Sequence, residues 1–136
     1  MKKIMKRIFA LGLCVLMFVT TLAFPANAAS ETDSVTLGTR QANFSLYLDQ
    51  MILSAYTKFE ARADYLEVNV ELWQKNASSG LITKCLDRSS GRYDVSTVSV
   101  SGTADHGYVF YSAKSTHLAR SGNLSGTGVL GPFYLN

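Results

Sequence analysis

The sequence predicts an all-β fold, an antiparallel two-sheet sandwich of about seven strands that follows an N-terminal signal helix. Apolar and polar residues alternate along several short segments, and most clearly along Tyr65–Trp73, where Leu66, Val68, Val70 and Leu72 share one face. A period of two is typical of a strand with one buried side. Turn-forming residues separate these segments, and there is no room for the crossover helices that a parallel sheet requires.

The first 28 residues have the three parts of a secretory signal. Its basic start is followed by an apolar run from Ile8 to Phe24, and Ala26-Asn27-Ala28 supplies the small residues that a signal peptidase accepts. The apolar run is close to the shortest that spans a bilayer, so a retained anchor is the alternative. We expect cleavage after Ala28, which makes the protein secreted, extracellular and without a stable membrane span.

Removal of residues 1–28 changes the charge of the chain. Four of the 13 basic residues and none of the 10 acidic residues lie in this segment, so the remainder has nine basic and ten acidic residues. A slightly negative domain lacks the electrostatic attraction that binds nucleic acid or an anionic membrane. The remainder divides into a polar stretch, residues 29–42, expected as a flexible leader or an edge strand, and residues 43–136, expected as the sandwich domain.

Cysteine usage gives no disulfide. Cys14 lies in the signal, which leaves Cys85 alone in the exported chain. A small secreted domain without disulfides depends on its hydrophobic core. We expect Cys85 to be a small buried apolar residue, with a reactive thiol as the alternative.

Several further segments alternate as strands do. They are residues 43–49, 81–86, 93–101, 108–118 and 124–135, and turns are expected at 76–80, 88–92, 102–107 and 121–123. The apolar phase shifts between Val95 and Val98, which predicts a β-bulge. Residues 50–63 fit either a strand or a helix capped by Asp49, and the neighbouring strands favour the strand.

The export signal and two strands carry a resemblance to a class of proteins. The strands are Tyr65–Trp73 and the aromatic-rich Gly107–Lys114. With the lysine-rich signal, they make the chain similar to short secreted single-domain β-sandwich proteins of Gram-positive bacteria, which are immunoglobulin-like or fibronectin-III-like. This resemblance implies a sandwich fold and assigns no activity.

Residues with catalytic or metal-binding chemistry are few. His106 and His117 are interpreted as a solvated loop histidine and a strand histidine, since no further metal ligands accompany them. Glu67 and Glu71 would lie roughly 13 Å apart on one strand, which is too far for a glycosidase pair. No Gly-x-Ser-x-Gly elbow is present. We therefore expect no catalytic residue, metal site or cofactor.

Outward-facing aromatic residues are the strongest functional signal. Tyr47, Tyr56, Tyr65 and Trp73 all alternate onto polar faces. Exposed aromatic rings provide contact area at low entropic cost, although a loop or a terminal segment covering them is the alternative. Trp73, Tyr65 and Tyr56 are the candidate ligand-binding residues. The expected function is a secreted non-enzymatic interaction module that binds an extracellular protein or glycan, and the alternative is a secreted antibacterial or toxin-like effector.

Overall fold

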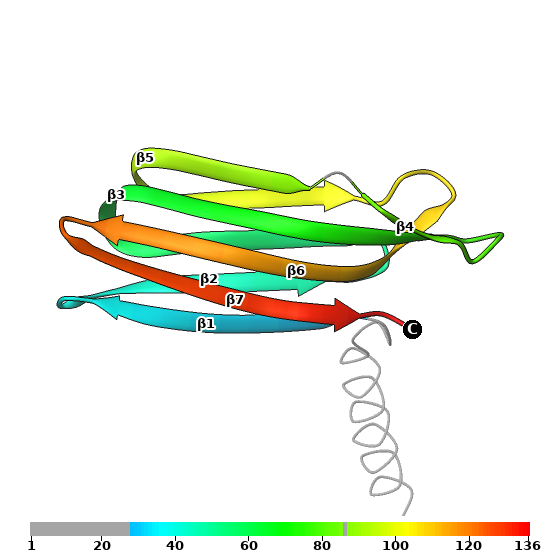
Figure 1. Cartoon of the computed structure of the whole chain (residues 1–136), viewed down its shortest axis with the longest axis horizontal. Helices are drawn as coiled ribbons and strands as arrows, with labels where there is room; N and C mark the ends of the chain where they lie inside the picture. The colour runs from blue at the N-terminus through cyan, green and yellow to red at the C-terminus, as the bar shows by residue number, and fades with distance from the viewer. Residues whose placement is uncertain (1–27, 86) are drawn as a thin grey trace, which may run out of the picture.

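The computed structural model describes residues 28–85 and 87–136, and these residues form β-strands and turns (Figure 1). The strands are β1 (Ala29–Leu37), β2 (Arg40–Leu48), β3 (Ile52–Asn76), β4 (Ile82–Lys84), β5 (Arg88–Thr103), β6 (Tyr108–Ser121) and β7 (Leu124–Tyr134). Every strand pair is antiparallel. The predicted all-β antiparallel fold is confirmed. The predicted signal helix lies outside the described residues.

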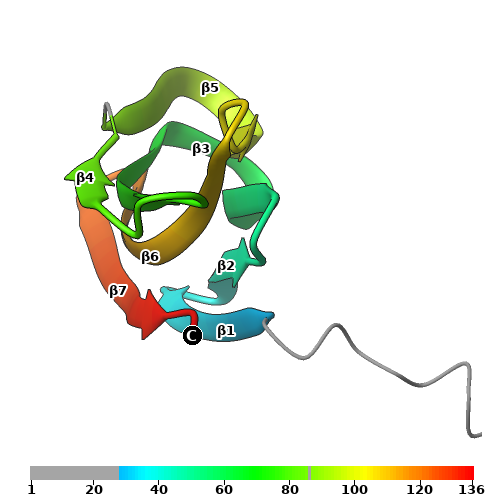
Figure 2. The same cartoon turned by 90° about the vertical axis from the view of Figure 1, so that its right-hand side faces the viewer.

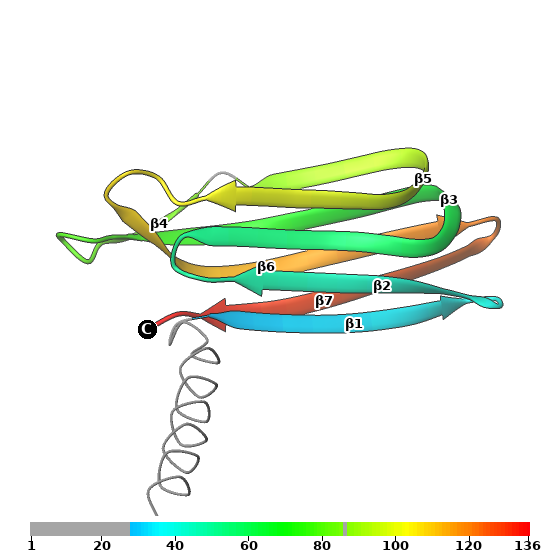
Figure 3. The same ribbon diagram turned by 180° about the vertical axis from the view of Figure 1, so that it is seen from behind.

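All seven strands belong to one sheet, whose order is β1-β2-β3-β6-β7, with β4 and β5 also paired to β3. The first wall of this sheet holds β1, β2, residues 52–58 of β3 and residues 97–103 of β5 (Figure 3). The second wall holds the remaining parts of β3 and β5 with β6 and β7 (Figure 1). Because β3 and β5 continue from one wall to the other, two separate sheets are not confirmed.

The sheet curls until its two ends meet, which gives a nearly closed cylinder (Figure 2). There β1 lies beside β7, and the backbone N–H of Gly131 donates a hydrogen bond to Glu31 Oε2 at 2.8 Å. Val35 of β1 packs over Gly126 of β7, where any larger residue would overlap it. The edges of β1 and β7 therefore lie side by side, which shields them from pairing with another chain.

Period-two alternation fills the space between the walls with apolar side chains. On β2 the buried residues are Ala42, Phe44, Leu46 and Leu48, and each intervening side chain is partly exposed. The same alternation continues along β3 and supplies the largest share of the core. Cys85 is half-buried and packs against the core, so it is less buried than the small buried apolar residue that the sequence predicts.

The structure settles three segments of the chain whose predicted conformation was open or is different. Residues 29–42 are not a flexible leader; they form β1 and the beginning of β2, in agreement with the edge-strand alternative. The strand interpretation of residues 50–63 is confirmed from Ile52 onward. Residues 88–92 are not a turn but the first part of β5. Their polar composition reflects a strand that is mostly exposed, since burial rather than turn chemistry decides where apolar residues are needed.

The predicted bulge marks the place where the sheet bends. The register between β3 and β5 shifts between Lys58 and Ala63, opposite Val95 and Thr97. A second shift, between Trp73 and Gln74, reverses the alternation of β6, so that Phe110 and Ala113 are both buried. Bulges of this kind increase local twist and allow a strand to turn a corner.

We predict that Gly128→Ala destabilises the protein by about 1–3 kcal/mol, the usual effect of overpacking a core. The Phe44 ring covers Gly128, where a Cβ would overlap it, and also stacks on His117, with 5.1 Å between the ring centroids. Urea unfolding measures the change. The control is Thr127→Ala at the neighbouring exposed position, expected to change the unfolding free energy by less than about 0.5 kcal/mol. Equal effects of both substitutions would contradict the packing argument.

Candidate functional site

The three predicted ligand-binding residues lie on two different walls. Tyr65 and Trp73 face outward from the second wall, and Tyr56 faces outward from the first. Trp73 and Tyr56 are 39% and 37% exposed. Tyr65 and Trp73 are separated by eight residues of one strand, or about 26 Å. The structure therefore places Tyr65 and Trp73 along one surface and does not bring Tyr56 to it.

Tyr65 forms an aromatic platform with two residues of neighbouring strands, Tyr93 and Arg120. The rings of Tyr65 and Tyr93 are 4.8 Å apart between centroids, and the Arg120 guanidinium lies 6.0 Å from the centre of the Tyr65 ring. The Tyr65 side chain crosses Gly91 of β5, where any Cβ would overlap its hydroxyl. Tyr93 is 79% exposed, which makes it the most accessible large aromatic residue of the platform.

Sequence reasoning missed Tyr93 and Arg120. Tyr93 follows a stretch that resembles a turn, and Arg120 lies at the end of a strand, so neither has a local signal of function. They meet Tyr65 because the register aligns Tyr93 of β5 and Arg120 of β6 with this one residue of β3. Alternation predicts that Tyr65 points outward, but only strand pairing identifies its neighbours.

A polar row connects the platform with Trp73 along β3. Glu67, Asn69 and Glu71 all face outward between the two aromatic positions. The Tyr65 hydroxyl donates a hydrogen bond to Glu67 Oε2 at 2.6 Å, and the Asn69 amide donates to Glu67 Oε1. The hydrogen bond from Tyr65 and, to a smaller degree, the one from Asn69 lower the pKa of Glu67. The bond between Tyr65 and Glu67 also raises the pKa of Tyr65. The row thus presents a fixed carboxylate with an amide beside it.

A serine and a histidine lie as close together as a nucleophile and its base would, but they lie inside the core. Ser115 Oγ lies 2.7 Å from His117 Nε2, and Thr57 Oγ1 lies 2.9 Å from His117 Nδ1. Thr57 donates its only hydroxyl hydrogen to the Glu67 carbonyl at 2.8 Å, so its oxygen accepts a hydrogen bond from Nδ1–H. His117 is therefore the neutral Nδ1–H tautomer, and Ser115 donates to Nε2.

This arrangement is structural, because no substrate reaches it. Ser115, His117 and Thr57 are each 0% exposed. Burial lowers the pKa of His117 to about 4, so the imidazole is neutral at physiological pH. The three side chains satisfy one another's hydrogen bonds inside an apolar core, which is the requirement for burying polar groups without a large penalty.

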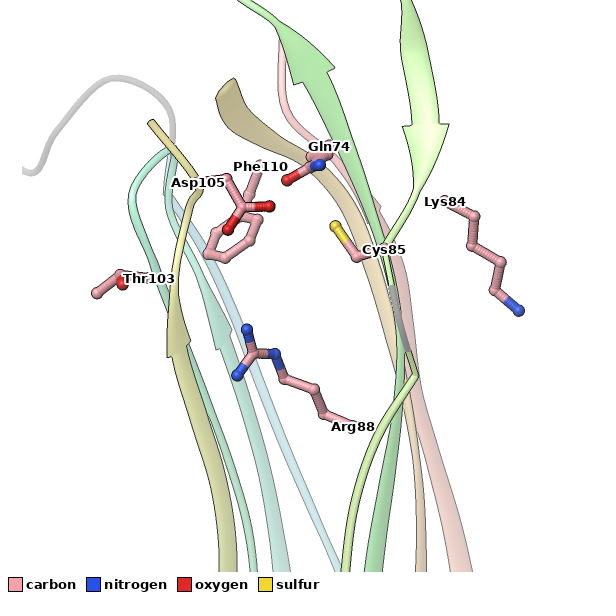
Figure 4. Close-up of a pocket in the computed structure, with 7 residues that line it drawn as sticks. All are labelled: Gln74, Lys84, Cys85, Arg88, Thr103, Asp105 and Phe110. Carbon is pink, nitrogen blue, oxygen red and sulfur yellow. The ribbon is translucent and has the colours of Figure 1, made fainter. Parts of the chain in front are cut away.

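A cavity of about 550 Å³ lies at the end of the molecule that carries β4 and the β5–β6 connection (Figure 4). The residues that line it are Gln74, Lys84, Cys85, Arg88, Thr103, Asp105 and Phe110. Cys85 is therefore a cavity residue. Burial and, to a smaller degree, Asp105 raise the pKa of its thiol, while Arg88 acts in the opposite direction. The thiol is thus protonated at neutral pH.

Within residues 28–85 and 87–136, no three His, Cys, Asp or Glu side chains gather to hold a metal ion. The same residues include no helix with the length and apolarity needed to cross a membrane. The chain matches no protein-family model and has no significant similarity to a curated protein.

We predict that acid destabilises the protein through His117. The folded-state pKa of about 4 lies below the ordinary value of 6.5, so the unfolded chain binds the proton more readily. The stabilisation is complete above pH 6.5 and is lost as the pH falls through 4, which amounts to about 3 kcal/mol. Urea unfolding at pH 7 and pH 4 measures the difference. In His117→Gln, which does not titrate, the pH-dependent loss should shrink by this amount; an unchanged loss would refute the assignment.

Proposed function

We propose that the protein is a secreted, non-enzymatic interaction module whose second wall binds an extended glycan at the cell surface. The observation that carries the proposal is the aromatic platform, because Tyr93 is largely exposed and packs beside Tyr65 and Arg120. Exposed tyrosine rings that are held in place by neighbours lose little entropy when a ligand covers them.

The polar row favours a glycan over an apolar protein surface. Between the platform and Trp73, the outward side chains of β3 are Glu67, Asn69 and Glu71, which accept and donate hydrogen bonds. Sugar rings present apolar C–H faces to aromatic rings and hydroxyl groups to carboxylates and amides. A chain of sugars along β3 would meet both kinds of partner in turn over about 26 Å.

Export is part of the proposal. We infer that residues 1–28 are a cleaved signal, because β1 begins at Ala29, directly after the proposed cut, and its pairing with β2 begins at Ala29 opposite Leu48. Cleavage after Ala28 would remove no strand and no core residue of the described domain. The surface of the second wall would then face the extracellular medium.

We predict that Tyr93→Ala weakens binding to cell-wall glycan by about tenfold or more, because it removes the most exposed ring of the platform. Sedimentation with purified peptidoglycan sacculi stripped of protein measures the affinity. Tyr56→Ala is the control, since it removes an exposed tyrosine of β3 that faces outward from the first wall. Trp73→Ala tests the far end of the row and should also weaken binding.

The same experiment separates the proposal from its competitors. Binding to untreated cells that disappears after protease treatment would identify a protein partner and overturn the glycan. Equal loss of binding in the Tyr93 and Tyr56 variants would remove the second wall as the binding surface. Growth inhibition of neighbouring bacterial strains by the purified protein would favour an effector.

We predict that the protein secreted by a Gram-positive host begins at Ala29, as intact-mass measurement of the culture supernatant would show. Replacing Ala28 by Lys should block processing, because the peptidase pocket accepts small residues, and should leave the protein with the cells. A secreted chain that begins inside β1 would contradict the proposed boundary, since it would lack residues that pair with β2.

A further inference from the structure

The cavity has the size and composition of a small-molecule site that is separate from the second wall's outer surface. Its volume of about 550 Å³ lies within the range of about 300–1,000 Å³ that is common for ligand pockets. Gln74 comes from the end of β3, Arg88 from the start of β5, and Asp105 from the connection to β6. Phe110, which is 2% exposed, supplies an apolar surface inside it.

Two opposite charges point into this cavity from different sides. Figure 4 shows the Arg88 guanidinium and the Asp105 carboxylate directed into the same space, with Gln74 and Phe110 behind them. The ion pairs of the described residues are Arg62–Asp94 and Lys84–Asp87, so Arg88 and Asp105 do not neutralise each other directly. Among the described residues, the Arg88 guanidinium donates one hydrogen bond, to the Ser101 carbonyl, and this bond is long at 3.4 Å.

Lys84 does not belong to this charge pair, although it lines the cavity. Its ammonium group turns away from the interior in Figure 4 and lies 3.2 Å from the Asp87 carboxylate. The cavity, in which Arg88 and Asp105 are both exposed to solvent, therefore presents one cation and one anion. A simple anion would satisfy Arg88 but would be repelled by Asp105, and a simple cation would have the reverse problem.

We propose that the cavity binds a small zwitterion of the amino-acid class. Its carboxylate would accept hydrogen bonds from Arg88, and its ammonium group would donate to Asp105. Both contacts are charge-assisted, which makes them the stronger kind of hydrogen bond. Its side chain would lie against Phe110, while Gln74 and Thr103 offer additional polar contacts.

The position of Arg88 depends on Gly102. The guanidinium lies across this glycine, and a Cβ there would come within 2.8 Å of Arg88 Cζ. Gly102 has no positive φ, so its backbone accepts alanine. Gly102→Ala would therefore move the Arg88 side chain aside without changing any charge. This substitution separates the geometry of the site from its net charge.

Isothermal calorimetry with L-phenylalanine tests the proposal, using two analogues that each lack one charge. The analogues are 3-phenylpropionate, which keeps the carboxylate, and phenethylamine, which keeps the ammonium group. We expect L-phenylalanine to bind at least about tenfold more tightly than either analogue, because only the zwitterion meets both charged side chains. Binding that is no tighter than that of the analogues, or no saturable binding at millimolar concentration, would overturn the proposal.

Variants assign the contacts. Arg88→Gln and Asp105→Asn should each weaken L-phenylalanine binding by about tenfold, and Gly102→Ala should weaken it to a similar extent. Lys84→Gln is the control, because it removes a cavity charge that points away, and it should leave the affinity unchanged. Thermal melting confirms that each variant is folded. An effect of Lys84→Gln equal to that of Arg88→Gln would overturn the assigned geometry.

Cys85 reports whether the ligand occupies the cavity. Its thiol lines the site and is half-buried, so bound L-phenylalanine should slow alkylation by iodoacetamide at least several-fold, with 3-phenylpropionate protecting less. A bound ligand that leaves the alkylation rate unchanged would lie elsewhere and would overturn the proposed location. Tyr93→Ala should not alter this protection, which keeps the test independent of the glycan surface.

Discussion

The fold depends on one continuous strand belonging to both walls. β3 pairs with β2 before its bend and with β6 after it, and β5 pairs with the other edge of β3 in both halves. At the bend, Arg62 Nη2 donates to the Asp94 carbonyl at 2.6 Å and Nε donates to the Asp94 carboxylate at 2.9 Å, while Asp94 adopts a φ of 54°. This ion pair is exposed and adds little stability, and it lies at the corner where β3 and β5 bend.

A corner in β3 explains how an uncrosslinked domain of this size encloses a core. Both walls contribute alternate side chains of the same strand, so Leu53 and Leu72 are buried in one interior although they lie in different walls. His117, Thr57 and Ser115 form a polar cluster within this interior. The two ring nitrogens of His117 are bonded to Thr57 of the first wall and Ser115 of the second wall, so the hydrogen bonds connect the walls. Buried polar contacts of this kind are sensitive to geometry and fix how the walls align.

β3 also organises the outer surface and the cavity. Its outward residues from Tyr65 to Trp73 form the proposed glycan surface, and the next residue, Gln74, lines the cavity. Trp73 and Gln74 point to opposite sides because side chains alternate along a strand, and the even-numbered residues from Leu66 to Leu72 face the interior. The end of β3 thus lies between two environments: a long exposed face with aromatic residues and a cavity with one cation and one anion.

The class of the fold and the direction of many side chains follow from the sequence alone. Alternation placed Phe44, Leu46 and Leu66 inside and Tyr65 and Trp73 outside, and the neighbouring strands favoured a strand over residues 50–63. Which residues are neighbours depends on how the strands pair in the folded protein. Tyr93 and Arg120 beside Tyr65, Thr57 beside His117, and Arg88 facing Asp105 all result from strand register and from the bend in β3 and β5. Alternation with a period of two predicts which side of a strand is buried. It does not predict which strand lies beside it, because pairing depends on residues that are distant in the chain.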